Sequence, residues 1–389
     1  MRQRRPKVPD VPLLMTPGPT QVRENVRLTR AMEMTSPISD EKFFKFYRKT
    51  CLKLESFLNT ESQVLILGGE GMLALDSVCA SLTEPGDRVL VIDNGIFGEG
   101  FADMVQTYGG KPVLFKGELT RGISVENLRE FLKKDSDFKF ATLVHCDTPS
   151  GVLNDLKEIC PVLKSYGILT VVDAVSSMVC EPIFTDEWNI DICMGSSQKG
   201  FSAPPGLCFL SISPEAWEKI ENRKTPIPSF YCNLSLWKNY FENFRFPYTM
   251  PIGDIYGFKA ALDNVLKEKN IVKRHQKIAK AVRKAVIRSG LSLYLKSDYS
   301  NSVTAIQVPE GLDGEVLVKK IRDEHGILIG GNLGRLKGKV IRIGHMGENA
   351  RPEYVGETLK ALQSVLENEG VRLNADMESI FLEEMIRRK

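Results

Sequence analysis

The sequence has few of the residues on which metal centres and disulfide scaffolds depend. Only four histidines occur in 389 residues, and the eight cysteines include no C-x-x-C pair. Zinc sites normally need such a pair or closely spaced histidines, so we expect no metal centre. Several cysteines lie within apolar runs, such as 75–82 and 190–194, which is typical of buried thiols in a reducing compartment.

The sequence also lacks a long hydrophobic run and an excess of charge of one sign. The segment VPLLMTPGPT (11–20) is too short and too rich in proline for a signal-peptide core or a membrane helix. Lys and Arg number 52 against 49 Asp and Glu, and neither sign forms a long block, so we expect no nucleic-acid or membrane partner. We therefore predict a cytoplasmic protein that binds small molecules. The basic first five residues are expected to form a disordered end.

What the sequence does contain is an alternation of short apolar runs with amphipathic segments over residues 63–211. Such unbroken apolar runs between helical segments are typical of a mainly parallel sheet with helices on both faces, so the predicted fold class is α/β. The predicted strands are VLIL (64–67), RVLVID (88–93), KPVLF (111–115), ATLVH (141–145), LTVVDA (169–174), DICMG (191–195) and GLCFLS (206–211). Segments 72–82, 98–108 and 125–133 are predicted helices.

The pattern changes after Pro251 and predicts a second, smaller unit. Residues 255–289 form one nearly continuous stretch of helix-forming sequence without proline. The following segments predict a compact α+β domain, with strands at 302–308 and 339–344, helices at 314–325 and 352–367, and a further amphipathic helix within 374–389. We therefore predict an N-terminal segment (1–20), a large domain (21–265) and a small C-terminal domain (266–389).

Two side chains at predicted strand ends suggest a cofactor. Asp173 closes the LTVVD run, and Lys199 follows the DICMG run within SSQKG. Taken singly, the lysine is more typical of a solvated loop and the aspartate of a helix N-cap. Together they supply what pyridoxal phosphate requires, because an amine can form an imine with its aldehyde and a carboxylate can pair with its protonated ring nitrogen.

Two glycine-containing turns add to this hypothesis. Gly68-Gly69-Glu70-Gly71-Met72 follows a predicted strand and opens a predicted helix, where backbone N–H groups can bind a phosphate. Asn94-Gly95-Ile96-Phe97-Gly98 follows the next strand, and Phe97 is placed to lie against a pyridine ring. Each signal is weak alone, since glycines often only turn the chain and a phenylalanine is more often part of a core.

With these residues in hand, the chain resembles a class V aminotransferase of pyridoxal-phosphate fold type I, and within that group the alanine:glyoxylate and serine:pyruvate aminotransferases. The resemblance runs from residue 13 to residue 347. It rests on LLMTPGPT (13–20), EPGDRVLV (84–91) with NGIFG, HCDTPSGVLNDL (145–156), VVDAVSS (171–177), SSQKGFSAPPG (196–206), YTMP (248–251) and VIRIGHMG (340–347). It implies a large domain with a mixed, mainly parallel sheet, a small C-terminal α+β domain and a homodimer.

The resemblance also implies a role for each candidate residue. Lys199 would bind the cofactor aldehyde and shuttle protons, Asp173 would hold the ring nitrogen, and Arg342 would bind the substrate carboxylate. The alternative for Arg342, less favoured even without the resemblance, is a strand residue paired with a surface acid. The remaining expected cofactor contacts are Gly69, Glu70, Gly71, Met72, Phe97, Thr148, Gln198 and Thr249, of which Thr148 would lie near the phenolic oxygen and Thr249 would reach the neighbouring subunit's site.

Three positions depart from the family pattern. Glu70 stands where many relatives have a phosphate-binding hydroxyl, so we expect only its backbone N–H to serve the phosphate, with the carboxylate turned away or protonated. Phe97 replaces the usual tryptophan over the ring. Phe246 replaces a phosphate-contacting tyrosine, which leaves Thr249 and Tyr248 to compensate.

The predicted activity is transfer of an amino group from alanine or serine to glyoxylate or pyruvate in two half-reactions. The alternatives are transaminases for 2-aminoethylphosphonate or ureidoglycine, a lyase such as a cysteine desulfurase, and a silent cofactor-binding regulator. Gln198 and Phe97 argue against the desulfurase, whose relatives have histidines there. Arg342 argues against a silent protein, which has no need to bind a substrate carboxylate.

Overall fold

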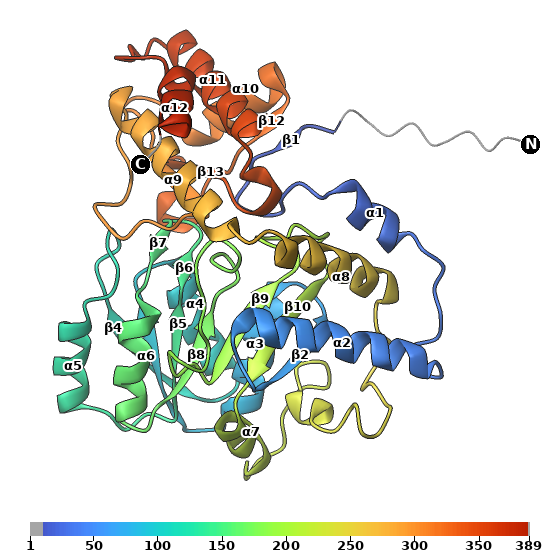
Figure 1. Cartoon of the computed structure of the whole chain (residues 1–389). Coiled ribbons are helices and arrows are strands. Elements are labelled where there is room, and N and C mark those ends of the chain that lie inside the picture. The colour runs from blue at the N-terminus through green and yellow to red at the C-terminus, as the bar shows by residue number, and fades with distance from the viewer. Residues whose placement is uncertain (1–10, 388–389) are drawn as a thin grey trace, which may run out of the picture.

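A seven-stranded sheet forms the centre of the computed structural model, which describes residues 11–387 (Figure 1). Its order is β2-β10-β9-β8-β5-β3-β4, and only β10 runs antiparallel to its neighbours. The strands are β2 (Gln63–Gly68), β3 (Arg88–Asp93), β4 (Lys111–Lys116), β5 (Phe140–Val144), β8 (Leu169–Asp173), β9 (Ile192–Ser196) and β10 (Leu207–Ile212). All seven predicted strands are therefore present, and together they make up this sheet.

Burial on both faces explains why these strands read as continuous apolar runs. Every residue of β5, β8, β9 and β10 is buried. Helix α3 packs on β9 and β10, α4 on β3 and β4, and α6 on β8. The helices of this part of the chain are α1 (Glu24–Arg30), α2 (Glu41–Leu58), α3 (Gly71–Leu82), α4 (Ile96–Thr107), α5 (Val125–Lys134), α6 (Leu156–Ser165), α7 (Pro214–Glu221) and α8 (Ile252–Lys267), with a 3₁₀ turn η1 (Leu234–Trp237) and a short hairpin of β6 (Cys146–Asp147) and β7 (Val152–Leu153).

The C-terminal part of the chain forms a second hydrophobic core, seen in orange and red in Figure 1. Strand β1 (Leu13–Leu14) joins this part by pairing in parallel with β12 (Ile327–Leu328), and Met15 is buried in its core. The other elements are α9 (Ile271–Arg288), β11 (Val303–Gln307), α10 (Gly314–His325), β13 (Val340–Gly344), α11 (Pro352–Asn368), α12 (Met377–Ile386) and the 3₁₀ turns η2 (Gly334–Leu336) and η3 (Gly347–Asn349). Strands β11 and β13 are antiparallel.

One prediction about this region was wrong. The continuous helix expected over 255–289 is two helices, since α8 ends at Lys267 and α9 begins at Ile271. Neither glycine nor proline marks the break, so the helical spacing of apolar residues gave no sign of it. Glu268 caps α8 and accepts a hydrogen bond from Arg274 Nε at 2.6 Å, which stabilises the turn.

Three other expectations have different outcomes. The domain boundaries at 20 and 265 stay a prediction, because separate folding of the parts has not been measured. The disordered end predicted for the first five residues lies outside the described residues. Between residues 11 and 387, no helix is both long and apolar enough to cross a membrane.

Candidate active site

Several predicted site residues meet around one cavity at the carboxyl edge of the sheet, where α/β folds bind ligands. Asp173 ends β8, and Lys199 follows the end of β9. The cavity has a volume of about 200 Å³. Its lining includes Glu70, Gly71, Met72, Phe97, Thr148, Asp173, Gln198 and Lys199 from the predicted set, together with Gly18, Pro19, Leu75, Val175, Ser176 and Pro205.

Asp173 is buried and lines this cavity. Burial raises the pKa of its carboxyl to about 6, although the Val175 N–H donates to Oδ1 at 2.8 Å and the charge of Lys199 also favours ionisation. A carboxylate that is costly to keep ionised in a buried site gains most from a cationic partner. A protonated pyridine nitrogen would be such a partner.

Lys199 is held against the N-terminal segment. Its Nζ donates a hydrogen bond to the Pro17 carbonyl at 2.6 Å. Burial, followed by the charge of Arg342, lowers the pKa of the amine to about 8. Gly18 has φ +91°, and a Cβ there would lie 2.7 Å from Lys199 Cε. The glycine of the T-P-G-P motif is therefore required both for its backbone conformation and for the space that the lysine occupies.

The expected anion site lies at the first turn of α3, but the side chain of Glu70 occupies it. Glu70 is the N-cap, and its Oε1 accepts from the Met72 N–H at 3.0 Å. Its Oε2 accepts from Gln198 Nε2 at 3.3 Å. We expected the Glu70 carboxylate to be turned away or protonated, and the structure does not turn it away but places it across the turn. Gly69 does not line the cavity, and its N–H donates to the Gly206 carbonyl at 2.8 Å.

Thr148 and Phe97 lie where the sequence predicts, and each is supported by a residue that the sequence analysis missed. The Thr148 hydroxyl is hydrogen-bonded to the Ser176 hydroxyl, which also lines the cavity. Buried Asp147 accepts from the Phe97 N–H at 3.0 Å and from the Ser150 hydroxyl at 2.8 Å. Asp147 lies within the motif HCDTPSGVLNDL, which was the available signal, but its contact with α4 depends on the tertiary fold.

Two predicted residues lie outside the cavity lining. Arg342, on β13, is partly buried beside it, where Nη1 donates to the Thr148 carbonyl at 3.3 Å and Nε to the Gly331 carbonyl at 2.8 Å. Thr249 is exposed and lines a separate surface depression with Arg30 and Pro251. Within one chain, the structure therefore does not bring Thr249 to Lys199.

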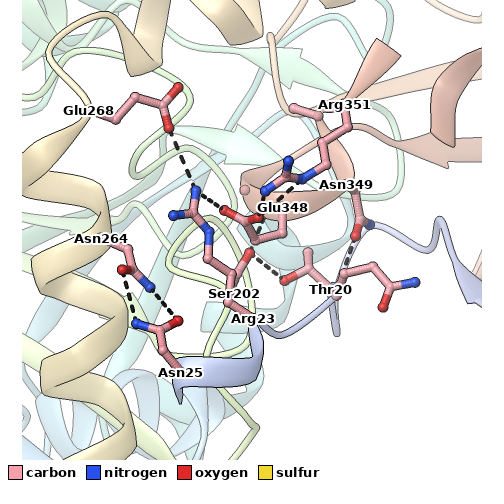
Figure 2. A network of polar contacts seen from close by, with 12 residues as sticks. Thr20, Arg23, Asn25, Ser202, Asn264, Glu268, Glu348, Asn349 and Arg351 are labelled. Atoms are coloured by element: carbon pink, nitrogen blue, oxygen red, sulfur yellow. Dashed lines mark hydrogen bonds and ion pairs between the residues drawn. The ribbon is translucent and has the colours of Figure 1, made fainter. Parts of the chain in front are cut away.

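A polar network joins the loop after Lys199 to other parts of the chain (Figure 2). Ser202 has φ +56°, and its hydroxyl contacts Thr20 Oγ1 at 3.0 Å and accepts from the Glu348 N–H at 2.8 Å. The Glu348 carboxylate pairs with Arg23 at 2.6 Å and with Arg351. The loop is thus attached both to the N-terminal segment and to the C-terminal part of the chain.

The two ends of the cavity fit a pyridoxal phosphate molecule unequally. At the ring end, Asp173 can pair with the ring nitrogen and Lys199 can reach the aldehyde carbon, so these residues fit the pyridoxal ring. At the phosphate end, Glu70 already accepts the N–H that a phosphate would need. The residues present therefore fit the ring and do not fit the phosphate dianion.

Comparisons with known proteins identify the family of the chain. The model of the aminotransferase class-V family matches residues 31–335. Ureidoglycine–glyoxylate aminotransferase from Bacillus subtilis has a TM-score of 0.94, with 27% identity, 98% of this chain and 100% of that chain covered. For pyridoxamine–pyruvate aminotransferase from Mesorhizobium loti the TM-score is 0.92, with 29% identity and 97% and 98% covered. Alanine–glyoxylate aminotransferase from Nostoc sp. has a TM-score of 0.89, with 31% identity and 94% and 97% covered. These likenesses confirm the predicted fold, and the chain belongs to the aminotransferase class-V family.

Proposed function

We propose that the protein is a transaminase that moves an amino group from a small amino acid, alanine or serine, to glyoxylate or pyruvate by a ping-pong mechanism. The observation that carries this proposal is that buried Asp173 and Lys199 line the same cavity. Solved relatives named for glyoxylate or pyruvate support the choice of acceptor. Pyridoxal 5'-phosphate is the cofactor expected on family grounds. Because this chain's residues fit its ring and not its phosphate, the roles proposed below concern the ring alone.

In this proposal each residue has one task. When bound, the cofactor supplies an electron sink for the carbon that loses its proton. Lys199 Nζ moves that proton, which suits an amine with a pKa of about 8, lowered first by burial. Asp173 would hold the proton on the ring nitrogen, and Phe97 and Thr148 would orient the ring. Arg342 binds the substrate carboxylate with its two-pronged guanidinium group, as a planar donor pair allows.

A second candidate donor is ureidoglycine, the substrate named for the Bacillus subtilis relative with a TM-score of 0.94. 2-Aminoethylphosphonate remains the other alternative from the sequence. Small amino acids, ureidoglycine and 2-aminoethylphosphonate each have an anionic or polar group that could face Arg342. Substrate screening therefore decides which of them is the donor.

We also propose a homodimer, and we keep the cytoplasm as the expected compartment. Several apolar side chains are exposed in α1 and in the segment after it, beside the depression that contains Thr249. They include Leu28, Met32, Met34 and Ile38. Such a patch favours burial against a second copy, which would let Thr249 reach the partner's cavity. The eight cysteines are all buried thiols, which fits a reducing compartment.

The test is a visible absorption titration of the purified protein supplied with cofactor. L-alanine, L-serine, ureidoglycine and 2-aminoethylphosphonate are added in turn, and Lys199→Ala is the control. Loss of the absorption of the lysine-bound cofactor with one donor, restored by glyoxylate or pyruvate, would support the proposal and identify the donor. Failure of every donor to change the spectrum would contradict it.

A further inference from the structure

The phosphate end of the cavity presents acceptor atoms where a phosphate would require donors. The Glu70 carboxylate takes the Met72 N–H at 3.0 Å and the Gln198 amide N–H at 3.3 Å. With its nitrogen committed to Glu70, the amide oxygen of Gln198 is buried and finds no hydrogen-bond partner within residues 11–387. Gln198 is 7% exposed and lines the cavity. This end of the cavity thus has one charged acceptor group and one unpartnered acceptor.

A phosphate dianion is poorly matched to these groups. It carries no proton to donate to Gln198 Oε1, and it must displace or adjoin the like charge of Glu70. The described cavity lining contains one cation, Lys199, and the proposed function assigns its amine to the aldehyde carbon and not to the phosphate.

A hydroxymethyl group in place of the phosphate is well matched. It is neutral, so it meets no repulsion from Glu70, and its O–H can donate to the carboxylate.

We propose that Glu70 is a specificity-determining residue that makes the cavity select a pyridoxal-type ring bearing a free hydroxymethyl group over the same ring bearing a phosphate. The inference rests on the proposed function for the ring position and deepens it, because it changes which form of the ring the protein takes. An unphosphorylated ring, held without a phosphate anchor, is then a ligand that the protein exchanges with solution.

The test compares the binding of pyridoxamine and pyridoxamine 5'-phosphate to the full-length protein by isothermal titration calorimetry at pH 8 and fixed ionic strength. Neither compound has an aldehyde, so the measurement does not depend on the chemistry of Lys199. The variants are Glu70→Ser, which keeps a capping hydroxyl without the charge, and Glu70→Asp, which keeps both cap and charge. Glu187→Gln removes an exposed carboxylate elsewhere and is the matched control.

We expect the unaltered protein and the Glu187→Gln control to bind pyridoxamine at least tenfold more tightly than its phosphate. Glu70→Asp should keep this preference, and Glu70→Ser should reduce the ratio at least tenfold. Tighter binding of the phosphate by the unaltered protein, or an unchanged ratio in Glu70→Ser with an unchanged melting temperature, would overturn the inference. Binding of neither compound would overturn it together with the ring assignment. Binding of pyridoxamine without amino transfer by any donor would support the inference and contradict the proposed function alone.

Discussion

Lys199 should behave as a base near neutral pH, and Arg342 should be one measurable reason for this. Burial, and then the charge of Arg342, lowers the pKa of the amine to about 8, while Asp173 acts in the opposite direction. At pH 7.5 an amine with a pKa of about 8 is roughly one quarter neutral, whereas an ordinary lysine is about one thousandth neutral. The structure therefore predicts a reactive fraction larger by a factor on the order of a few hundred.

The assay is reductive methylation of the protein with formaldehyde and cyanoborohydride between pH 6 and pH 11, followed by peptide mass spectrometry. The rate follows the neutral fraction of each amine, and Nα-acetyl-lysine in the same reaction reports an ordinary amine. Methylation at Lys199 should be half-maximal near pH 8. In Arg342→Gln the midpoint should move to higher pH, because a like charge has been removed.

Access to the cavity changes the rate at Lys199 but leaves the midpoint of its pH profile in place. A midpoint above about pH 10 in the unaltered protein would show that burial and Arg342 do not perturb this amine, and would refute the reasoning. An unchanged midpoint in Arg342→Gln would leave burial as the cause and remove Arg342 from it.

Three further predictions concern the supports of the site. Gly18→Ala should lower the free energy of unfolding by on the order of 1–2 kcal/mol, because Gly18 has a left-handed backbone conformation. It should also slow methylation of Lys199, because the new Cβ would lie 2.7 Å from Lys199 Cε. Thermal melts and the methylation assay check the two effects, and unchanged Lys199 reactivity would contradict the packing argument. Asp173→Asn should lower amino transfer by on the order of a hundredfold or more while pyridoxamine still binds, since one preorganised charge at the ring is lost; steady-state rates and calorimetry check this, and a near-normal rate would be the contrary result. Glu348→Gln should lower the free energy of unfolding by about 1–3 kcal/mol at pH 7. Burial raises the pKa of Glu348, but the hydrogen bonds and charges of Arg23 and Arg351 lower it by more, so the pKa lies below the ordinary 4.5. The stability that this carboxylate contributes is fully present above pH 4.5 and lost as the pH falls through the lowered value, so denaturant melts should show the variant and the unaltered protein converging in acid.

The sheet and the two strand-end residues were predictable because local sequence determines them. Strands buried on both faces must be apolar throughout, so the runs that form β5, β8 and β9 stand out without knowledge of their neighbours. A polar residue that ends such a run must lie at the edge of the sheet. For this reason Asp173 and Lys199 could be assigned together from their positions relative to two strands.

The supporting contacts were not predictable, because they join segments that are distant in the sequence. The carbonyl of Pro17 that accepts from Lys199 lies 182 positions away. Asp147 contacts the backbone of Phe97 across 50 positions. The break between α8 and α9 has no glycine or proline, and it depends on the hydrogen bond between Arg274 and Glu268. The conflict at Glu70 was visible as a departure, but only the side-chain geometry shows that the carboxylate occupies the turn.

The loop that carries Lys199 is hydrogen-bonded to two other parts of the chain, and these bonds hold its backbone in place. Thr20 donates to the Lys199 carbonyl at 3.1 Å, and its N–H donates to the Gln198 carbonyl at 3.1 Å. Asn349 in turn accepts from the Gln21 N–H at 2.9 Å, so the C-terminal part is joined to the same segment (Figure 2). These bonds fix the backbone that carries Lys199, while the side chain itself faces the cavity. Under the proposed function Lys199 releases and regains its partner in each cycle, and a fixed backbone keeps its amine at the cavity while it does so.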